Sequence, residues 1–245
     1  MSPPLGLDAT AAGFVAALAR AGGLAFTAPL LGDKTTPTRV RLVFTVAVAA
    51  VLAARRAAPA DPVLALAALP IELGAGLVTG ITARFILERV STGAQLIGIH
   101  AGLGFAQSYD HAAGESATVV RALVSTIGGL AFLAADGLEA LVRALATPVS
   151  TAALADGLTG ATDAALQVAA AAIGIAAPVL LAATIVNVGL ALINRAAPAV
   201  NVFSISLPVV LVIAGIALLS TASITAGAID HAASDAVAVL LGGRS

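Results

Sequence analysis

The feature that most constrains the fold is a pair of long apolar runs in the C-terminal third of the chain. Ala164–Asn194 has 31 residues and Ala196–Ile229 has 34 residues without Asp, Glu, Lys or Arg. A helix needs about 20 apolar residues to cross a bilayer, so each run is long enough to span. Both runs are rich in Ala and Leu, which favour helix. The runs predict an all-α integral membrane protein.

Composition excludes most other classes of protein. Of the 245 residues, 60% are hydrophobic and 10% are charged, whereas soluble domains carry about 25% charged residues. The net charge of −1 argues against nucleic-acid binding through a basic surface. The chain has no Cys, which excludes disulfides, thiolate metal sites and Cys nucleophiles. Outer-membrane barrels show alternating segments of about 10 residues, and these continuous runs do not alternate.

The sequence predicts about six to seven hydrophobic helices, several of them short, kinked or interrupted by charges. They are expected near 10–31, 40–54, 63–91, 92–106, 118–146, 165–194 and 203–228. We expect a single membrane domain over 1–245, composed of an N-terminal helical part at about 9–147, a polar linker at about 148–163 and a long C-terminal helix pair at about 164–229. Pro178 and Pro208 lie inside that pair and should bend its helices.

Charges inside the apolar segments leave two interpretations open. Arg20, Glu72 and Arg84 fall near the middle of their segments, and such charges normally face protein or water because lipid does not solvate them. They fit a subunit that packs against partner proteins, or a stand-alone transporter of small solutes. The pattern GxxxG occurs at Gly76–Gly80 and at Gly98–Gly102. It marks close helix packing in membranes, but it also arises by chance in a chain rich in Gly.

Nothing in the sequence specifies an enzyme. The three histidines, His100, His111 and His231, have no partner at a metal-ligand spacing, and no GxSxG nucleophile motif is present. Asp110, His111 and Glu115 could form a proton relay or a solvated loop. We therefore expect no catalytic residue, no metal and no cofactor.

Three segments, in the same order, resemble the FliR family of flagellar export-apparatus membrane proteins, called SctT in virulence type III secretion. The first segment runs from Arg20 to Pro29 and on to Pro37-Thr38-Arg39-Val40-Arg41-Leu42. The second segment is Gly93–Phe105 and leads to Tyr109-Asp110. The third segment is Asn187–Phe203, which contains Asn194-Arg195-Ala196-Ala197-Pro198 and is followed by Leu207-Pro208. The family usually has Asp-Pro where this chain has Asp110-His111. The match in order, spacing and length extends over nearly the whole chain.

The resemblance implies a core subunit of a protein-export gate in the bacterial inner membrane, within the basal body of a flagellum or injectisome. Such a subunit would form a channel with FliP-like and FliQ-like proteins, work beside an FlhB-like protein, and pass unfolded protein substrates. Its other partner would be membrane lipid, and nucleic acid would not be one.

The resemblance also implies roles for particular residues. A loop in the pore of the gate, at about Gly104 to Glu115, would act as a plug; its candidate residues are Gly104, Phe105, Gln107, Tyr109, Asp110, His111, Gly114 and Glu115. Other residues are expected in subunit packing or assembly. These are Arg20, Pro29, Pro37, Arg39, Gly98, Gly102, Asn194, Arg195, Pro198, Phe203 and Pro208.

Overall fold

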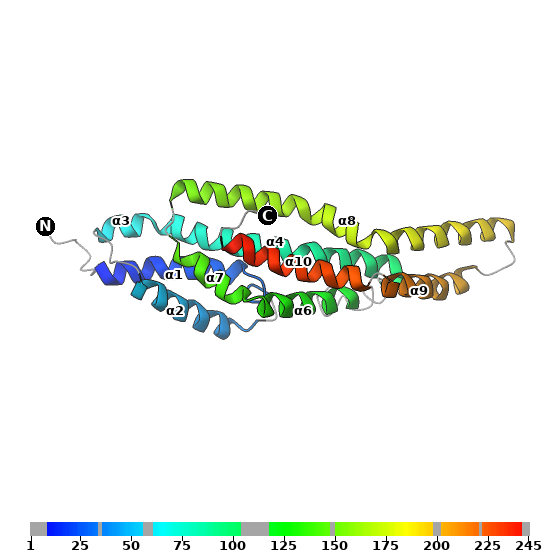
Figure 1. Cartoon of the computed structure of the whole chain (residues 1–245), viewed down its shortest axis with the longest axis horizontal. Coiled ribbons are helices and arrows are strands. Elements are labelled where there is room, and N and C mark those ends of the chain that lie inside the picture. The colour runs from blue at the N-terminus through cyan, green and yellow to red at the C-terminus, as the bar shows by residue number, and fades with distance from the viewer. Residues whose placement is uncertain are drawn as a thin grey trace. The chain divides into compact units, whose positions relative to one another are not determined.

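All the secondary structure in the described part of the chain is helical, which confirms the all-α prediction (Figure 1). The computed structural model describes residues 9–33, 36–55, 61–103, 118–147, 150–197, 202–220 and 222–241. Its elements are α1 (Ala9–Thr27), α2 (Thr38–Arg55), α3 (Pro62–Ala67), α4 (Leu69–Gly98), the π-helix η1 (Ile99–Leu103), α6 (Val119–Ala134), α7 (Gly137–Ala146), α8 (Thr151–Ala196), α9 (Val202–Ser220) and α10 (Ala222–Leu240).

The helices are long and apolar enough for a polytopic membrane protein. Within the described residues, three candidate spans lie at Thr10–Thr27, Leu69–Ala101 and Thr151–Ala196. The pairs α6–α7 and α9–α10 each contain a bend, and counting each pair as one span raises the number to five. The chain is therefore an all-α polytopic membrane protein.

The chain forms two compact units, each assembled from separate stretches of sequence. The first unit comprises Met1–Ile86, Phe132–Ala165 and Ala233–Ser245, and the second comprises Leu87–Ala131 and Leu166–Ala232. Helices α4, α6, α8 and α10 each contribute residues to both units. The units therefore do not follow one another along the sequence as consecutive domains do.

Most of the stretch expected as a polar linker at 148–163 is helical, because α8 already begins at Thr151. Ser150 caps this helix, since its Oγ accepts a hydrogen bond from the backbone N–H of Ala153 at 3.1 Å. Leu154 packs beside Gly74 of α4. The polar side chains that suggested a linker, such as Asp156, lie on the exposed side of the helix.

Other predicted helix ends also differ from the observed ones. The helices expected at 63–91 and 92–106 are largely one helix, α4, preceded by the short α3 and followed by η1. The helix expected at 118–146 is divided at Asp136, whose φ of 59° is left-handed. A Cβ at the next residue, Gly137, would collide with the Phe132 ring, so the turn requires glycine there. The helix expected at 203–228 is divided into α9 and α10.

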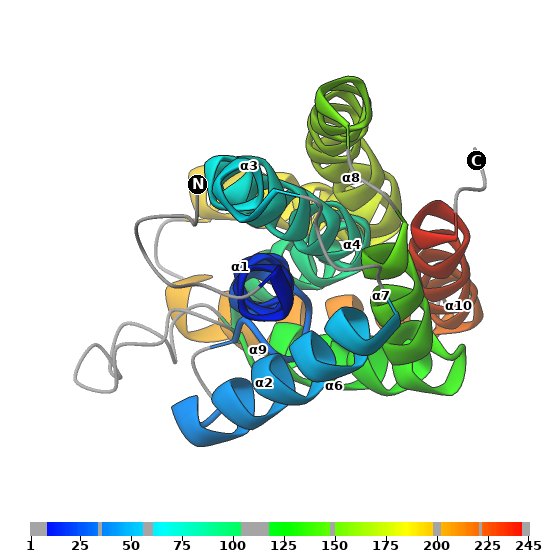
Figure 2. The same ribbon diagram turned by 90° about the vertical axis from the view of Figure 1, so that its left-hand side faces the viewer.

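In the first unit, α1 lies between α2 and α4 and approaches α4 closely (Figure 2). A Cβ built on Gly76 of α4 would collide with the backbone of Arg20, and one on Gly80 with the backbone of Ala28. Gly23 of α1 meets the backbone of α4 in the same way. The Gly76–Gly80 pattern therefore marks a helix–helix contact, and this contact lies within the chain.

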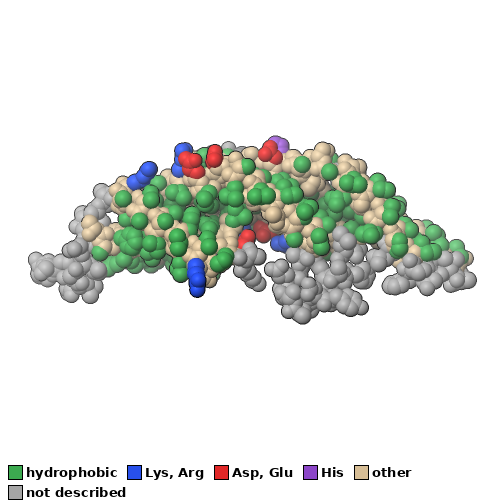
Figure 3. All heavy atoms as spheres, turned by 90° about the horizontal axis from the view of Figure 1, so that it is seen from below, with side chains coloured by type: hydrophobic (Ala, Val, Ile, Leu, Met, Phe, Trp, Pro, Cys, Tyr) green, Lys and Arg blue, Asp and Glu red, His purple; other side chains and the backbone are tan. Residues whose placement is uncertain are grey.

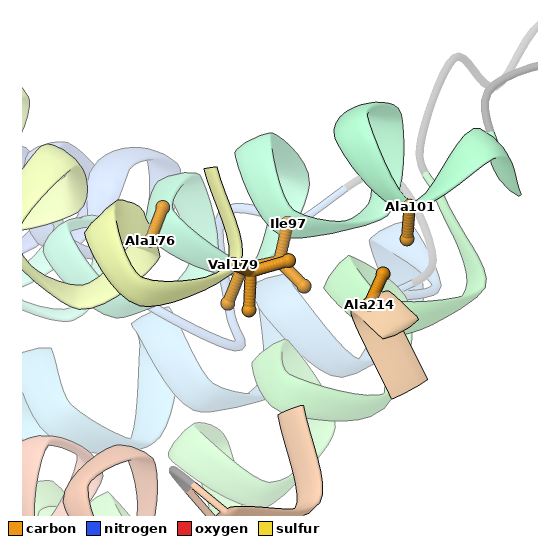
Figure 4. Packing of buried hydrophobic residues seen from close by; sticks show 5 residues of the cluster. All are labelled: Ile97, Ala101, Ala176, Val179 and Ala214. Atoms are coloured by element: carbon orange, nitrogen blue, oxygen red, sulfur yellow. The ribbon is translucent and has the colours of Figure 1, made fainter. Parts of the chain in front are cut away.

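The second unit has a core of small side chains. Ile97 and Ala101 pack against Ala176 and Val179 of α8 and against Ala214 of α9, and all five are at most 6% exposed (Figure 4). Ile97 and Val179 point toward one another, and Ala101 faces Ala214 (Figure 4). Alanine at these positions lets the backbones come close, as the composition of the chain leads one to expect.

The close approach of α1 and α4 makes a testable prediction. We expect Gly76→Ala to lower the thermal unfolding midpoint of the detergent-solubilised protein, because the added methyl group meets backbone that cannot rotate away. Overpacking of this kind costs about 1–3 kcal/mol. Far-UV circular dichroism during heating measures the midpoint.

Gly189→Ala provides the control, because a Cβ on this α8 glycine has nothing within 4 Å. That substitution should leave the midpoint unchanged or raise it, since alanine favours helix over glycine by up to about 1 kcal/mol. Equal midpoints for Gly76→Ala and wild type would contradict the close approach.

Candidate functional site: polar helix junctions

Arg20 is the most buried charged residue in the described part of the chain, with 1% of its surface exposed. Its Nε donates a hydrogen bond to Oε2 of Glu72 in the first turn of α4, at 2.5 Å. Its Nη1 donates to the carbonyl oxygens of Leu145 at 2.9 Å and Thr147 at 2.7 Å. One guanidinium group therefore connects α1, α4 and the end of α7.

The contact with α7 gives hydrogen-bond donors to backbone carbonyl groups that have no partner within the helix. The last four carbonyls of a helix have no partner within the helix, and Leu145 lies in the last turn of α7, which ends at Ala146. The negative end of the helix dipole also attracts a cation. Arg20 thus supplies both the hydrogen-bond donors and the positive charge that this helix end favours.

A small cavity lies beside Arg20 in the first unit. Its volume is about 120 Å³, and its walls come from α1, α4, α7 and α8, including Val78, Leu145 and Leu154. Apart from Arg20, two threonines supply its polar side chains, Thr79 and Thr147. In the described residues, no group of three or more His, Cys, Asp or Glu is placed to hold a metal ion. The arrangement at Arg20 is one of packing and charge pairing.

The turn between α1 and α2 is organised by Arg41, a residue of the first motif that was not among the predicted site residues. Its Nε donates to the carbonyl of Leu31 at 2.9 Å and its Nη2 to that of Asp33 at 3.2 Å. Its guanidinium also lies 6.0 Å from the centre of the exposed Phe26 ring, a cation–π distance. The Asp33 carboxylate pairs with Arg84 of α4 at 3.3 Å. Arg41 therefore holds the turn between α1 and α2 in place.

Three residues predicted for assembly lie in this turn or in the first turn of α2. Pro29 is buried. Pro37 precedes α2, and its carbonyl accepts the first backbone hydrogen bonds of the helix, from Val40 at 3.0 Å and Arg41 at 3.3 Å. Arg39 is exposed. Pro37 is exposed as well, so both Pro37 and Arg39 are accessible to a partner protein, whereas Pro29 is not.

The second unit contains a polar face of α4 whose residues were not predicted as site residues. Glu88, Ser91 and Gln95 are spaced three and four residues apart, so they lie on one side of the helix. Arg121 of α6 donates to Glu88 Oε2 at 3.1 Å, and Ser91 Oγ donates to the same oxygen at 2.5 Å. Thr118 donates to Gln95 through both its backbone N–H and its hydroxyl. The regular spacing was the signal in the sequence.

All the candidate plug residues lie outside the described residues. These are Gly104, Phe105, Gln107, Tyr109, Asp110, His111, Gly114 and Glu115. Among the assembly candidates, Pro198 also lies outside the described residues. Gly102 lies in η1 and Phe203 in α9. Gly98 is buried against Thr118 of the same chain.

The remaining assembly candidates lie on exposed surface. Asn194 and Arg195 are exposed in the last turn of α8, and Pro208 is exposed within α9. Their predicted role in assembly remains a prediction, and their exposure leaves them accessible to a partner protein.

The geometry of Arg20 predicts a large effect on stability. We expect Arg20→Ala to lower the free energy of unfolding by about 3–5 kcal/mol, because it leaves Glu72 without its cation and removes two donors from the end of α7. Arg20→Lys should lose part of this, since an ammonium group cannot reproduce the planar donor set. Denaturant titration of the solubilised chain measures the loss.

Arg143→Ala is the matched control, because Arg143 pairs with Glu139 on an exposed helix surface where both side chains are more than half exposed. It should change the free energy of unfolding by about 0.5 kcal/mol or less. If Arg20→Ala and Arg143→Ala lowered the free energy of unfolding by similar amounts, the contacts of Arg20 would not be important for stability.

Comparison with known proteins places the chain in a family. The family model described as "Bacterial export proteins, family 1" matches residues 11–236. The flagellar biosynthetic protein FliR of Caulobacter vibrioides is 29% identical over 225 residues, which cover 84% of this chain and 87% of that protein. FliR of Escherichia coli K12 is 27% identical over 212 residues, covering 83% of this chain and 81% of that protein. Since the family match extends over most of the sequence and the relatives are FliR proteins, this chain belongs to the FliR family of bacterial export proteins.

Proposed function

We propose that this chain is a core subunit of a flagellar protein-export gate in the bacterial inner membrane. With FliP-like and FliQ-like subunits it would form the channel for unfolded export substrates, beside an FlhB-like protein. The observation that carries the proposal is the family match over residues 11–236. The names of the relatives favour the flagellar system over the virulence system. The chain would act as a structural transport component and not as an enzyme.

The distribution of side-chain size supports an assembly. The buried face of α8 is made mainly of small residues, with Ala161, Ala172 and Ala183 each at most 7% exposed. Large apolar side chains of the same helix face outward, such as Leu166 at 76% and Ile185 at 71% exposed. Hydrophobic side chains cover much of the face in Figure 3, where charged side chains are few. Such a surface requires lipid or apolar partner subunits to cover it.

The charges that suggested a stand-alone solute transporter have structural partners. Arg20 pairs with Glu72 and with the end of α7, and Arg84 pairs with Asp33. A transporter binding site would instead hold charges available to a solute or a coupling ion. These contacts therefore favour the gate-subunit function over the transporter.

We assign two roles within the proposed gate. The segment at about Gly104 to Glu115 is the pore plug, as the resemblance to the family implies. The Asn194–Arg195 end of α8 is an assembly contact, because it combines the third family motif with an exposed position. Arginine is enriched at protein interfaces, which agrees with this assignment.

Purification from the native membrane tests the assembly. We expect the tagged chain to carry FliP-like and FliQ-like proteins with it, and Arg195→Ala to reduce their recovery at least severalfold, as expected for truncation of an interface hot spot. Arg55→Ala is the matched control, because Arg55 is exposed at the end of α2 and belongs to none of the three family motifs. Recovery of the tagged wild-type chain without either partner would refute the proposed function.

Deletion of residues 107–115 tests the plug. We expect the deletion to leave the gate assembled and to make it leak ions, because nothing would then fill the pore of the closed gate. Conductance of gate-containing membranes, normalised to the amount of assembled complex, measures the leak. The wild-type gate should not leak ions in the same type of preparation. Equal conductance of the deletion variant and the wild-type gate would contradict the plug assignment.

A further inference from the structure

One side of α8 packs inside the second unit through a regular line of apolar positions. Ala176 and Ala183 are buried on this side, and Leu180 between them packs against the apolar cluster of the unit. The three positions are four and three residues apart, and residues at this spacing are neighbours along one side of a helix. This line is therefore the packing side of α8.

The same spacing continues toward the end of the helix, but the residues there are no longer covered. After Ala183, the line passes through Asn187, Leu190 and Asn194, which are again four, three and four residues apart. Asn187 and Asn194 are exposed and Leu190 is half-buried. Residues 191–196 are exposed on all sides of the helix. The packing side of α8 thus continues past the described helices that cover it, and it changes there from alanine to asparagine.

The position of Asn187 in the apolar run indicates what can cover it. It lies eight residues before Arg195, which corresponds to about 12 Å along the helix axis. A charged side chain at the end of an apolar run favours the polar interface of the bilayer, so Asn187 lies within the hydrocarbon layer of about 30 Å. Lipid chains offer no hydrogen bond, and an amide without one is costly to bury. This side of α8 therefore favours protein over lipid.

The side chains on the line also specify the chemistry of the partner. An asparagine amide both donates and accepts hydrogen bonds, so its complement is another amide or a hydroxyl group. The line carries no charge, which favours a neutral partner. Alternating steps of three and four residues are typical of helices that pack lengthwise at a small crossing angle. Polar side chains of this kind form hydrogen bonds between helices in membranes.

We propose that Asn187 and Asn194 are the hydrogen-bonding residues of a contact between α8 and a transmembrane helix of another gate subunit. The facing helix would present uncharged amide or hydroxyl side chains, and Leu190 would pack between the two asparagines. The inference rests on the proposed function, because the partner helix belongs to the gate. It extends the assembly contact at Asn194 and Arg195 by two turns into the membrane and gives it a direction along α8.

The test replaces the amides by a side chain of nearly the same shape. In the double variant Asn187→Leu/Asn194→Leu the amides are lost, whereas Asn187→Gln keeps one. Thr184→Val is the matched control, because it also removes a polar group from exposed surface of α8. Thr184 lies beside the line, and its hydroxyl donates to the carbonyl of Leu180 in the same helix at 2.7 Å. The tagged full chain is purified from its native membrane, and the FliP-like and FliQ-like proteins that it carries are quantified.

We expect the double variant to lower the recovery of the facing subunit about tenfold, because two hydrogen bonds between helices are lost. Asn187→Gln should retain more of the partner than Asn187→Leu, and Thr184→Val should behave as wild type. The thermal unfolding midpoint of the solubilised chain should not fall in the double variant, since both asparagines are exposed in the chain itself. A lower midpoint would place the amides in the fold of this chain and overturn the contact.

A photo-reactive residue at position 190 gives an independent measurement. The chain has no Cys, but the sequences of the partners are not needed if benzoylphenylalanine replaces Leu190 in the complete gate. We expect the crosslink to fall on a transmembrane helix of a FliP-like or FliQ-like protein, within one turn of an Asn, Gln, Ser or Thr. Crosslinks to lipid alone would contradict the proposed contact.

The remaining outcomes separate the contact from the proposed function. If the wild-type chain carries no gate subunit, the proposed function fails and the contact fails with it. If the wild type carries its partners and the double variant carries them equally well, the contact alone is wrong. Equal recovery together with altered ion conductance of the gate would instead place the asparagines in a water-filled channel, which also overturns the contact.

Discussion

The close approach of α1 and α4 is the contact on which the first unit depends. Glu72 and Gly76 lie one helical turn apart on the same face of α4, and the Gly76 contact brings the backbone of Arg20 onto that face. The guanidinium can then reach Glu72 and also the carbonyls at the end of α7. A larger residue at Gly76 would separate the helices and weaken the pairing of Arg20 with Glu72 in an apolar environment, where loss of a charge partner is costly.

The close packing of small residues inside the chain also explains why its surface is apolar. Alanine and glycine form the contacts inside the chain, and larger apolar residues such as Leu166 and Ile185 face outward. Helices in membranes associate through close packing of small residues, because lipid is already as apolar as leucine. Burial within this chain therefore leaves a large apolar surface, and the proposed gate assembly would share its coverage between lipid and neighbouring subunits.

The sequence predicted the class of fold and the family, but it identified only some of the residues that make the main polar contacts. Arg20 was noted both as a charge inside an apolar segment and as part of the first family motif, and the structure shows its partners. Gln95 and Thr118 were missed because they are common polar residues 23 positions apart, and neither is unusual in its own segment. The stretch expected as a linker at 148–163 is mostly helical, because its polar residues lie on the exposed side of α8. The predicted roles of Asn194, Arg195 and the plug residues remain predictions.

The sequence by itself determined that the chain is helical, membrane-embedded and a member of the FliR family, because long uncharged runs and collinear motifs are local properties of the chain. It also showed that Gly76–Gly80 could be a packing contact. Only the tertiary structure decided that this contact is made with α1, that Arg20 caps α7, and that Gln95 holds Thr118. Those pairings join residues from 23 to 125 positions apart, so local pattern cannot select them. They are decided by which backbones can approach closely enough for these side chains to reach their partners.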